Sequence, residues 1–205
     1  MMGTPIKGLL QLIAVLTATA LLSAASRAGI LNGHAAAFGG IAGSVPFNNG
    51  VGLSGTIDYA VFTAAAFNAN FAGLGYVPGS ALVYTYQVEV TGVEGVSAEI
   101  IGVSNPANTI GTFNIGDVDA VSASFTPNAR WLFAPEIPTG MSSYGLAFSS
   151  PNLPIVGASL TINGGTQALV AGVPTPGPIA IPEPASFLLL AGGVAAACLS
   201  RRFRR

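Results

Sequence analysis

The residue types from which most nucleophilic active sites are built are scarce in this chain. His34 is its one histidine, Cys198 is its one cysteine, and no lysine follows Lys7. A Ser-His-Asp or Cys-His site needs a histidine beside the nucleophile, and a multi-histidine zinc site needs several imidazoles. His34 lies in a Gly- and Ala-rich stretch that we expect to be flexible. The composition therefore excludes these sites, and we expect no catalytic residue and no cofactor.

Paired carboxylates are the remaining route to catalysis, because two of them flanking a glycosidic bond are the minimum equipment of a glycosidase. The candidates are Glu89, Glu94, Glu99 and Glu136. Glu89 alternates with apolar residues and is expected on the solvent face of its strand. No spacing brings any two of the four together. We expect that the protein is not an enzyme, and a secreted hydrolase is the least favoured of three functions.

Asp117 and Asp119, beside Asn114 and Gly116, have the oxygen-rich composition of a calcium loop. An EF-hand loop needs further acidic ligands and a terminal glutamate at fixed spacing, and these are missing here. A solvated turn is the favoured interpretation, so we expect no metal site, with Asp117 and Asp119 as weak calcium candidates.

Arg130 and Trp131 form a candidate sugar contact. An exposed indole stacks on a sugar ring, and a guanidinium donates hydrogen bonds to hydroxyls. A lone tryptophan in a β-domain more often belongs to the core. The exposure of Trp131 therefore discriminates between a carbohydrate-binding module and a structural domain.

The elements that position these residues are predicted to be strands. Residues 81–91 alternate with a period of two, so Leu82, Tyr84 and Tyr86 share a face that we expect to be buried, while the other face meets water. Similar short runs are separated by Gly, Asn and Pro. They predict an all-β fold, a single β-sandwich over residues 29–172 with about eight or nine short strands. The runs are 55–63, 81–91, 96–103, 109–115, 118–125, 131–133, 144–149, 155–162 and 167–173.

Three shorter segments complete the predicted domain. Residues 163–166, Asn-Gly-Gly-Thr, predict a tight hairpin, because Asn and Gly tolerate positive φ. Residues 64–72 are the one candidate for a helical turn. Residues 29–52 are expected to be partly irregular, with 45–47 or 51–53 joining a sheet edge.

The charge balance excludes a class of partners. Between Gly29 and Ala180 the chain has seven acidic side chains and one basic side chain, Arg130, which gives a net charge of −6. Nucleic-acid binding needs clustered Lys and Arg, so we expect no nucleic acid as a partner. The same region contains no cysteine, so it forms no disulfide.

The N-terminal residues 1–28 have the three parts of a signal peptide. Lys7 is followed by an apolar stretch over residues 8–22 and by small residues up to Ala28. Cleavage after Ala28 or after Ala25 fits the small-residue pattern. These features predict signal peptidase and the general secretion machinery as partners; a retained N-terminal membrane helix is the alternative.

The C-terminal part changes character after residue 172. Residues 173–184 are rich in proline and predict an extended linker. Residues 185–205 predict a short transmembrane helix and an Arg-rich cytoplasmic end. The apolar run 185–199 has 15 residues, which span about 23 Å as a helix, less than a bilayer core of about 30 Å. The positive-inside rule keeps Arg201, Arg202, Arg204 and Arg205 in the cytoplasm.

Pro182, Glu183 and Pro184, the short apolar run and the terminal arginines together resemble the PEP-CTERM sorting signal of Gram-negative bacteria. The resemblance implies exosortase as a partner, cleavage near the motif, and transient residence in the inner membrane before display at the cell surface or in the extracellular matrix. A plain C-terminal membrane anchor is the alternative. Residues 58–62 and 84–88 also resemble strands of β-rich modules that precede many such signals.

The resemblance further implies a function in the envelope. Proteins of this class accompany exopolysaccharide production, so we expect a structural or adhesive role in a biofilm. The alternative is a carbohydrate-binding module that recognises the matrix polysaccharide.

Overall fold

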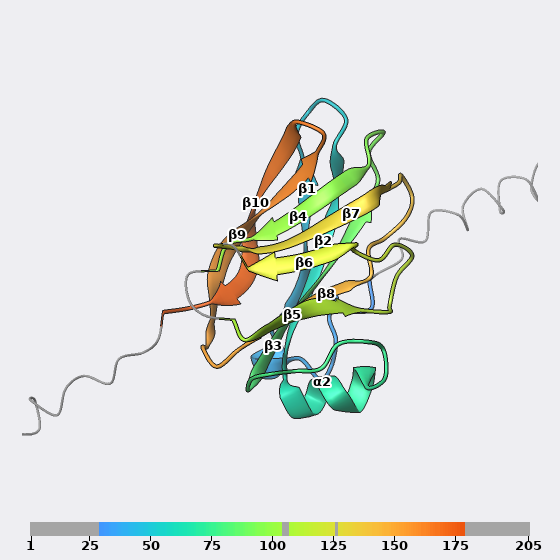
Figure 1. Cartoon of the computed structure of the whole chain (residues 1–205). Coiled ribbons are helices and arrows are strands. Elements are labelled where there is room, and N and C mark those ends of the chain that lie inside the picture. The colour runs from blue at the N-terminus through green and yellow to red at the C-terminus, as the bar shows by residue number, and fades with distance from the viewer. Residues whose placement is uncertain (1–28, 104–106, 126, 179–205) are drawn as a thin grey trace, which may run out of the picture. The chain divides into compact units, whose positions relative to one another are not determined.

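The computed structural model describes residues 29–103, 107–125 and 127–178 (Figure 1). The predicted signal peptide, the sorting signal with its Pro182–Pro184 motif, and the predicted transmembrane helix with its arginines lie outside the described residues. From Leu31 onward these residues form two antiparallel sheets that pack face to face, so the predicted all-β fold is confirmed.

Each sheet has five strands. Sheet A has the order β1 (Ala42–Asn48), β2 (Ser54–Thr63), β3 (Leu82–Val90), β8 (Gly145–Ser150), β5 (Thr109–Phe113). Sheet B has the order β10 (Thr166–Pro176), β9 (Pro154–Asn163), β4 (Val96–Ile101), β7 (Ala129–Ile137), β6 (Ser122–Phe125). The ten strands are the nine expected runs and the edge strand β1, which contains the expected segment 45–47.

The two sheets are interleaved by the chain. Strand β8 lies between β3 and β5 in sheet A, and β7 lies between β4 and β6 in sheet B. Five connections therefore cross from one sheet to the other: β3 to β4, β4 to β5, β5 to β6, β7 to β8 and β8 to β9. Every strand pair is antiparallel. This winding joins distant segments and leaves two edges in each sheet.

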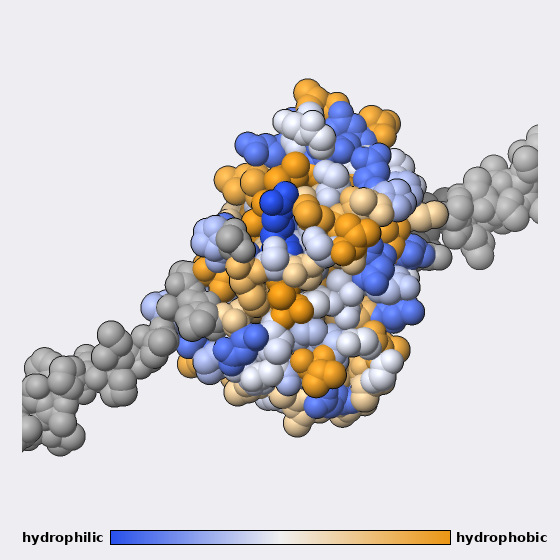
Figure 2. Space-filling view, in the orientation of Figure 1, coloured by the Kyte–Doolittle hydropathy of each residue, from blue (hydrophilic) through white to orange (hydrophobic). Residues whose placement is uncertain are grey.

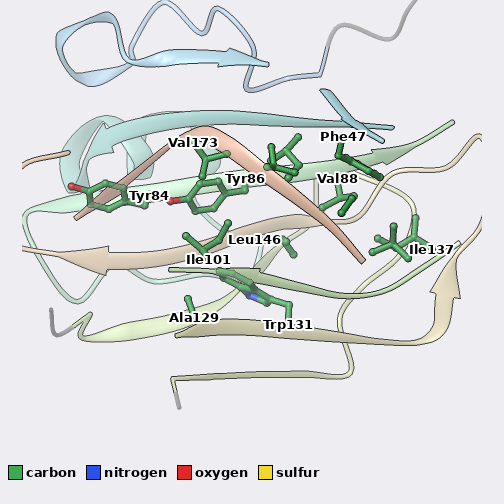
Figure 3. Close-up of a cluster of buried hydrophobic side chains, with 14 of the residues drawn as sticks. Phe47, Tyr84, Tyr86, Val88, Ile101, Ala129, Trp131, Ile137, Leu146 and Val173 are labelled. Atoms are coloured by element: carbon green, nitrogen blue, oxygen red, sulfur yellow. The ribbon is translucent and has the colours of Figure 1, made fainter. Parts of the chain in front are cut away.

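Aromatic side chains fill the space between the sheets (Figure 3). Tyr84 stacks on Phe148 with ring centroids 5.2 Å apart, and Trp131 stacks on the same phenylalanine at 6.4 Å. The two tyrosines of β3 also link their strand to the sheet B side. The Tyr84 hydroxyl donates to the carbonyl of Asn152 at 2.8 Å, and the Tyr86 hydroxyl donates to that of Pro174.

The prediction that β3 has one face in water is wrong, because both of its faces are buried up to Val88. The outer face of sheet A is covered by α2 (Ala64–Phe71), which begins where the Thr63 hydroxyl accepts a hydrogen bond from the Ala66 N–H at 3.1 Å. This helix presents Phe67 and Phe71 to a second hydrophobic cluster, which includes Val83. The candidate helical turn at 64–72 is therefore an α-helix of 8 residues, and it covers this second hydrophobic cluster.

Strand β10 extends further than the sequence predicts. Residues 173–176, the first four of the predicted linker, pair with residues 154–157 of β9. Proline lacks a backbone N–H and is tolerated on an edge strand, which is the position of β10. Gly172, with φ of 100°, forms a bulge in front of this extension. The predicted sandwich boundary at residue 172 therefore moves to 176.

Candidate functional sites

Trp131 is fully buried, the favoured interpretation of a lone tryptophan in a β-domain, so it is not accessible as a sugar contact. Its Nε1–H donates to the carbonyl of Gly111 at 2.9 Å, so its polar atom is also used inside the protein. Arg130 precedes it and is exposed on the opposite face of β7. Successive side chains of a strand point to opposite faces, so the two residues cannot act on one ligand.

The weak calcium candidates accept hydrogen bonds within the protein. Asp117 Oδ2 accepts from the Ser142 N–H at 2.9 Å and from its hydroxyl at 3.1 Å. Asp119 Oδ1 accepts from the Thr112 hydroxyl at 2.7 Å. Within the described ranges, no group of three or more His, Cys, Asp or Glu side chains gathers where a metal ion could bind. The two carboxylates hold the β5–β6 connection to β5 and to the segment before β8.

His34 lies in an ordered turn, and this corrects the expectation of a flexible stretch. Its Nδ1 accepts a hydrogen bond from the Ala36 N–H at 3.2 Å. Its ring packs edge-on against Phe62, with centroids 5.0 Å apart, and against Phe71 at 5.6 Å. The imidazole therefore has a structural role beside the second hydrophobic cluster.

Three of the four candidate glutamates belong to the surface. Glu89 is half-buried and lies 3.5 Å from the Thr56 hydroxyl, and Glu94 accepts from the Thr166 hydroxyl at 2.9 Å. Glu136 is exposed near the end of β7. Each is thus positioned by its own strand or turn.

Glu99 differs from the others because its side chain is fully buried inside the sandwich. Its strand register places it between Trp131 of β7 and Thr161 of β9, so all three point toward the core. The Thr161 hydroxyl donates to Glu99 Oε2 at 2.7 Å. Glu99 Oε1 and the buried Ser159 hydroxyl make no hydrogen bond.

This environment changes the acidity of the Glu99 carboxyl. Burial raises the pKa of Glu99 from 4.5 to about 7, against the opposing effect of the hydrogen bond from the Thr161 hydroxyl. Burial also raises the pKa of Tyr86, and the charges of Tyr84 and Glu99 add to that effect. Sequence reasoning missed this site because Glu99 was assessed only as half of a carboxylate pair. Glu99 is two residues from Ile101 in the same strand, so the two side chains share a face. Because Ile101 is apolar, this spacing could have identified Glu99 as a core-facing residue.

A shallow groove of about 260 Å³ lies where the β1–β2 and β9–β10 hairpins meet. Its lining is Ile41, Tyr59, Pro154, Ile155, Val156, Gly172 and Pro174. No carboxylate, imidazole or basic group is among these residues, so the groove suits an aliphatic group. Within residues 29–103, 107–125 and 127–178, no helix has the length and apolar character needed to cross a bilayer.

Comparison with known proteins gives one match, at the C-terminal end. Residues 180–205 match the family model of the PEP-CTERM protein-sorting motif. No curated protein and no solved structure shows significant similarity to the chain. PEP-CTERM proteins are exported through the membrane and processed by exosortase. The chain is therefore an exported protein that carries the PEP-CTERM sorting motif at residues 180–205 and has exosortase as its processing partner.

Proposed function

We propose that the β-sandwich is a structural or adhesive component of the cell surface or extracellular matrix, associated with exopolysaccharide in a biofilm. One observation carries this proposal: the side chains that could do chemistry are used to build the domain. Trp131 and Glu99 are buried between the sheets, His34 packs on phenylalanines, and Asp117 and Asp119 hold a loop.

The sorting motif supports the location of this role. A protein that is exported and then handed to exosortase performs its task outside the inner membrane. In our proposal the secretion machinery and signal peptidase process residues 1–28, and the inner membrane holds the chain as an intermediate. Exosortase then acts near Pro182, Glu183 and Pro184, while the arginines after the apolar run stay in the cytoplasm.

The architecture is suited to a structural role. Two five-stranded antiparallel sheets are wound through each other, and tyrosine hydroxyls of β3 bond to main-chain carbonyls on the sheet B side. The described ranges carry seven acidic residues and one basic residue, which favours solubility among other acidic material. The carbohydrate-binding alternative needs an exposed Trp131. Trp131 is buried, so this alternative is not part of the proposal.

A complementation experiment tests the proposal. A strain without the gene receives the wild-type chain, a Glu183→Ala variant, or a chain in which both Glu89 and Glu94 are changed to Gln. The readouts are the cohesion of the biofilm under shear and the amount of the protein in the washed matrix. We expect the wild-type chain and the double Gln variant to restore cohesion, and the Glu183→Ala variant to accumulate in membranes.

A hydrolase would behave differently from a structural protein. Loss of cohesion in the double Gln variant, at wild-type protein level in the matrix, would show that carboxylate chemistry is required. If the biofilm is fully cohesive while its washed matrix contains none of the protein, the protein has no structural role in the matrix. Either result contradicts the proposal.

A further inference from the structure

The outer face of sheet B is mainly apolar across its middle strands β9, β4 and β7, and no element covers it in the described part of the chain. The strand register aligns Leu169, Leu160, Ile100 and Arg130 across β10, β9, β4 and β7. The positions next to them along each strand, Thr161, Glu99 and Trp131, point into the core, so this row points outward. The next outward row is Ile162, Ala98 and Leu132, with the exposed polar residues Gln167 of β10 and Ser122 of β6 at its two ends.

Several of these side chains remain accessible to solvent. Leu169 is 77% exposed and Val156 of β9 is 81% exposed, while Ile100, Leu132, Leu160 and Ile162 are half-buried by their neighbours. The one α-helix of the described residues, α2, packs on β2 and β3 of sheet A. Sheet B lies toward the viewer in Figure 1, and apolar groups are spread over this side of the molecule in Figure 2. A contiguous apolar face of this kind marks an interaction surface.

The charges on this face form a complementary pair at two ends of one strand. The five strands of sheet B contain three charged residues, Glu99, Arg130 and Glu136, of which Glu99 is buried. A Cβ added at Gly95 would lie 2.7 Å from Glu136 Cδ, so the Glu136 side chain lies directly over that glycine at the opposite end of β7 from Arg130. Six residues of strand span up to about 20 Å.

We propose that this face binds a second copy of the same domain, sheet B against sheet B. A two-fold axis that runs across the strands, between Arg130 and Glu136, reverses the strand direction of the partner. Arg130 of each copy then faces Glu136 of the other, and the apolar rows pack together between the two ion pairs. An interface with this symmetry is self-complementary. The proposed dimer does not depend on the proposed structural or adhesive role.

Charge also decides against other occupants. An anionic lipid surface attracts clusters of Lys and Arg, and Arg130 is the one basic residue among the described ranges. A sugar polymer needs exposed aromatic rings, and the aromatic residues of β7, Trp131 and Phe133, are buried. A second copy supplies both the apolar surface and the carboxylate that this face needs.

The size of the sheet bounds the affinity. Five strands about 4.8 Å apart and about 20 Å long give roughly 500 Å² of face on each copy. An interface of about 1,000 Å² in total is at the weak end of specific complexes, so a dissociation constant in the micromolar range is expected.

The fragment 29–178 is suited to the test because all ten strands and both hydrophobic clusters lie inside it. Sedimentation equilibrium over chain concentrations from about 1 to 500 µM brackets the expected constant. The variants are Arg130→Glu, Glu136→Arg and the double exchange of both. Leu169→Asp tests the apolar face, and Val77→Asp is its matched control, since Val77 is 76% exposed in the loop before β3.

We expect a wild-type dimer, and about tenfold or greater weakening in each single charge variant, because like charges then face each other. The double exchange restores the dimer, Leu169→Asp abolishes it, and Val77→Asp leaves it intact. Circular dichroism confirms that each variant is folded.

A monomeric wild type at every concentration, or a dimer that none of the sheet B variants affects, overturns the proposal. Equal weakening in the double exchange and the single variants refutes the pairing of Arg130 with Glu136. A monomer that co-sediments with phosphatidylglycerol vesicles through Leu169 would assign the face to the membrane instead.

Discussion

The buried Glu99 carboxyl should make the stability of the domain depend on pH. In the unfolded chain the carboxyl has its ordinary pKa of 4.5, whereas burial raises the pKa in the folded chain to about 7. The folded state therefore holds this proton more tightly than the unfolded state. The free energy of unfolding is highest below pH 4.5, falls as the pH rises to about 7, and stays at the lower value above that.

The magnitude follows from the pKa difference. One pKa unit corresponds to about 1.4 kcal/mol, so the loss between acidic and alkaline conditions is about 3 kcal/mol. This is a large share of the 5 to 15 kcal/mol, roughly, that stabilises an ordinary domain. In Glu99→Gln the side-chain amide oxygen can take the place of Glu99 Oε2 and accept from the Thr161 hydroxyl, but the side chain cannot ionise. The variant should lack this component of the pH dependence and be more stable than the wild type at alkaline pH.

Urea unfolding of the fragment 29–178 at pH 5 and at pH 8 measures the effect. The fluorescence of Trp131 reports on the core directly, because it is the one tryptophan of the chain and is fully buried. The Glu94→Gln variant, whose side-chain oxygen can still accept from the Thr166 hydroxyl, is the matched control and should follow the wild type. Identical changes in unfolding free energy between the two pH values in the wild type and in Glu99→Gln would refute the reasoning.

Three further predictions concern residues whose roles the structure assigns. Trp131→Ala should cost about 3 to 5 kcal/mol in urea unfolding followed by circular dichroism, because it empties part of the core and leaves the Gly111 carbonyl without its donor; a cost below about 1 kcal/mol would place the indole outside the core. Gly116→Ala should cost about 1 to 3 kcal/mol in the same assay, since the added Cβ would collide with the Ser143 carbonyl, and unchanged stability would show that this approach is not close. Thr63→Ala should cost about 0.5 to 2 kcal/mol by removing the cap of α2, with Thr63→Ser as the control; equal loss in both would mean that the hydroxyl is not the cap.

Much of the fold could be predicted because its signals are local. The alternation in β3 and the turn residues between runs identify strands one at a time, and Asn163 to Thr166 specify the β9–β10 hairpin through the backbone freedom of glycine. The helix at 64–71 follows a threonine that caps it. None of these signals needs information about distant parts of the chain.

The remaining features depend on contacts between distant segments. Both faces of β3 are buried because α2 covers sheet A, and alternation within β3 cannot reveal that cover. Arg130 and Trp131 are adjacent, and strand geometry places them on opposite faces, but only the packing of β7 between β4 and β6 decides which one is inside. Glu99 is buried for the same reason, since its strand is central in sheet B. The extension of β10 through Pro174 and Pro176 required knowledge that β10 is an edge strand.

The central claim is that the C-terminal segment is a sorting signal that exosortase removes from an exported domain. Intact mass analysis of the protein from the matrix, compared with the protein from cells that lack exosortase, tests it most directly. We predict that the matrix form ends near Pro182 to Pro184 and that the form without exosortase continues to Arg205. Matrix protein whose mass still includes Arg205 would contradict the claim.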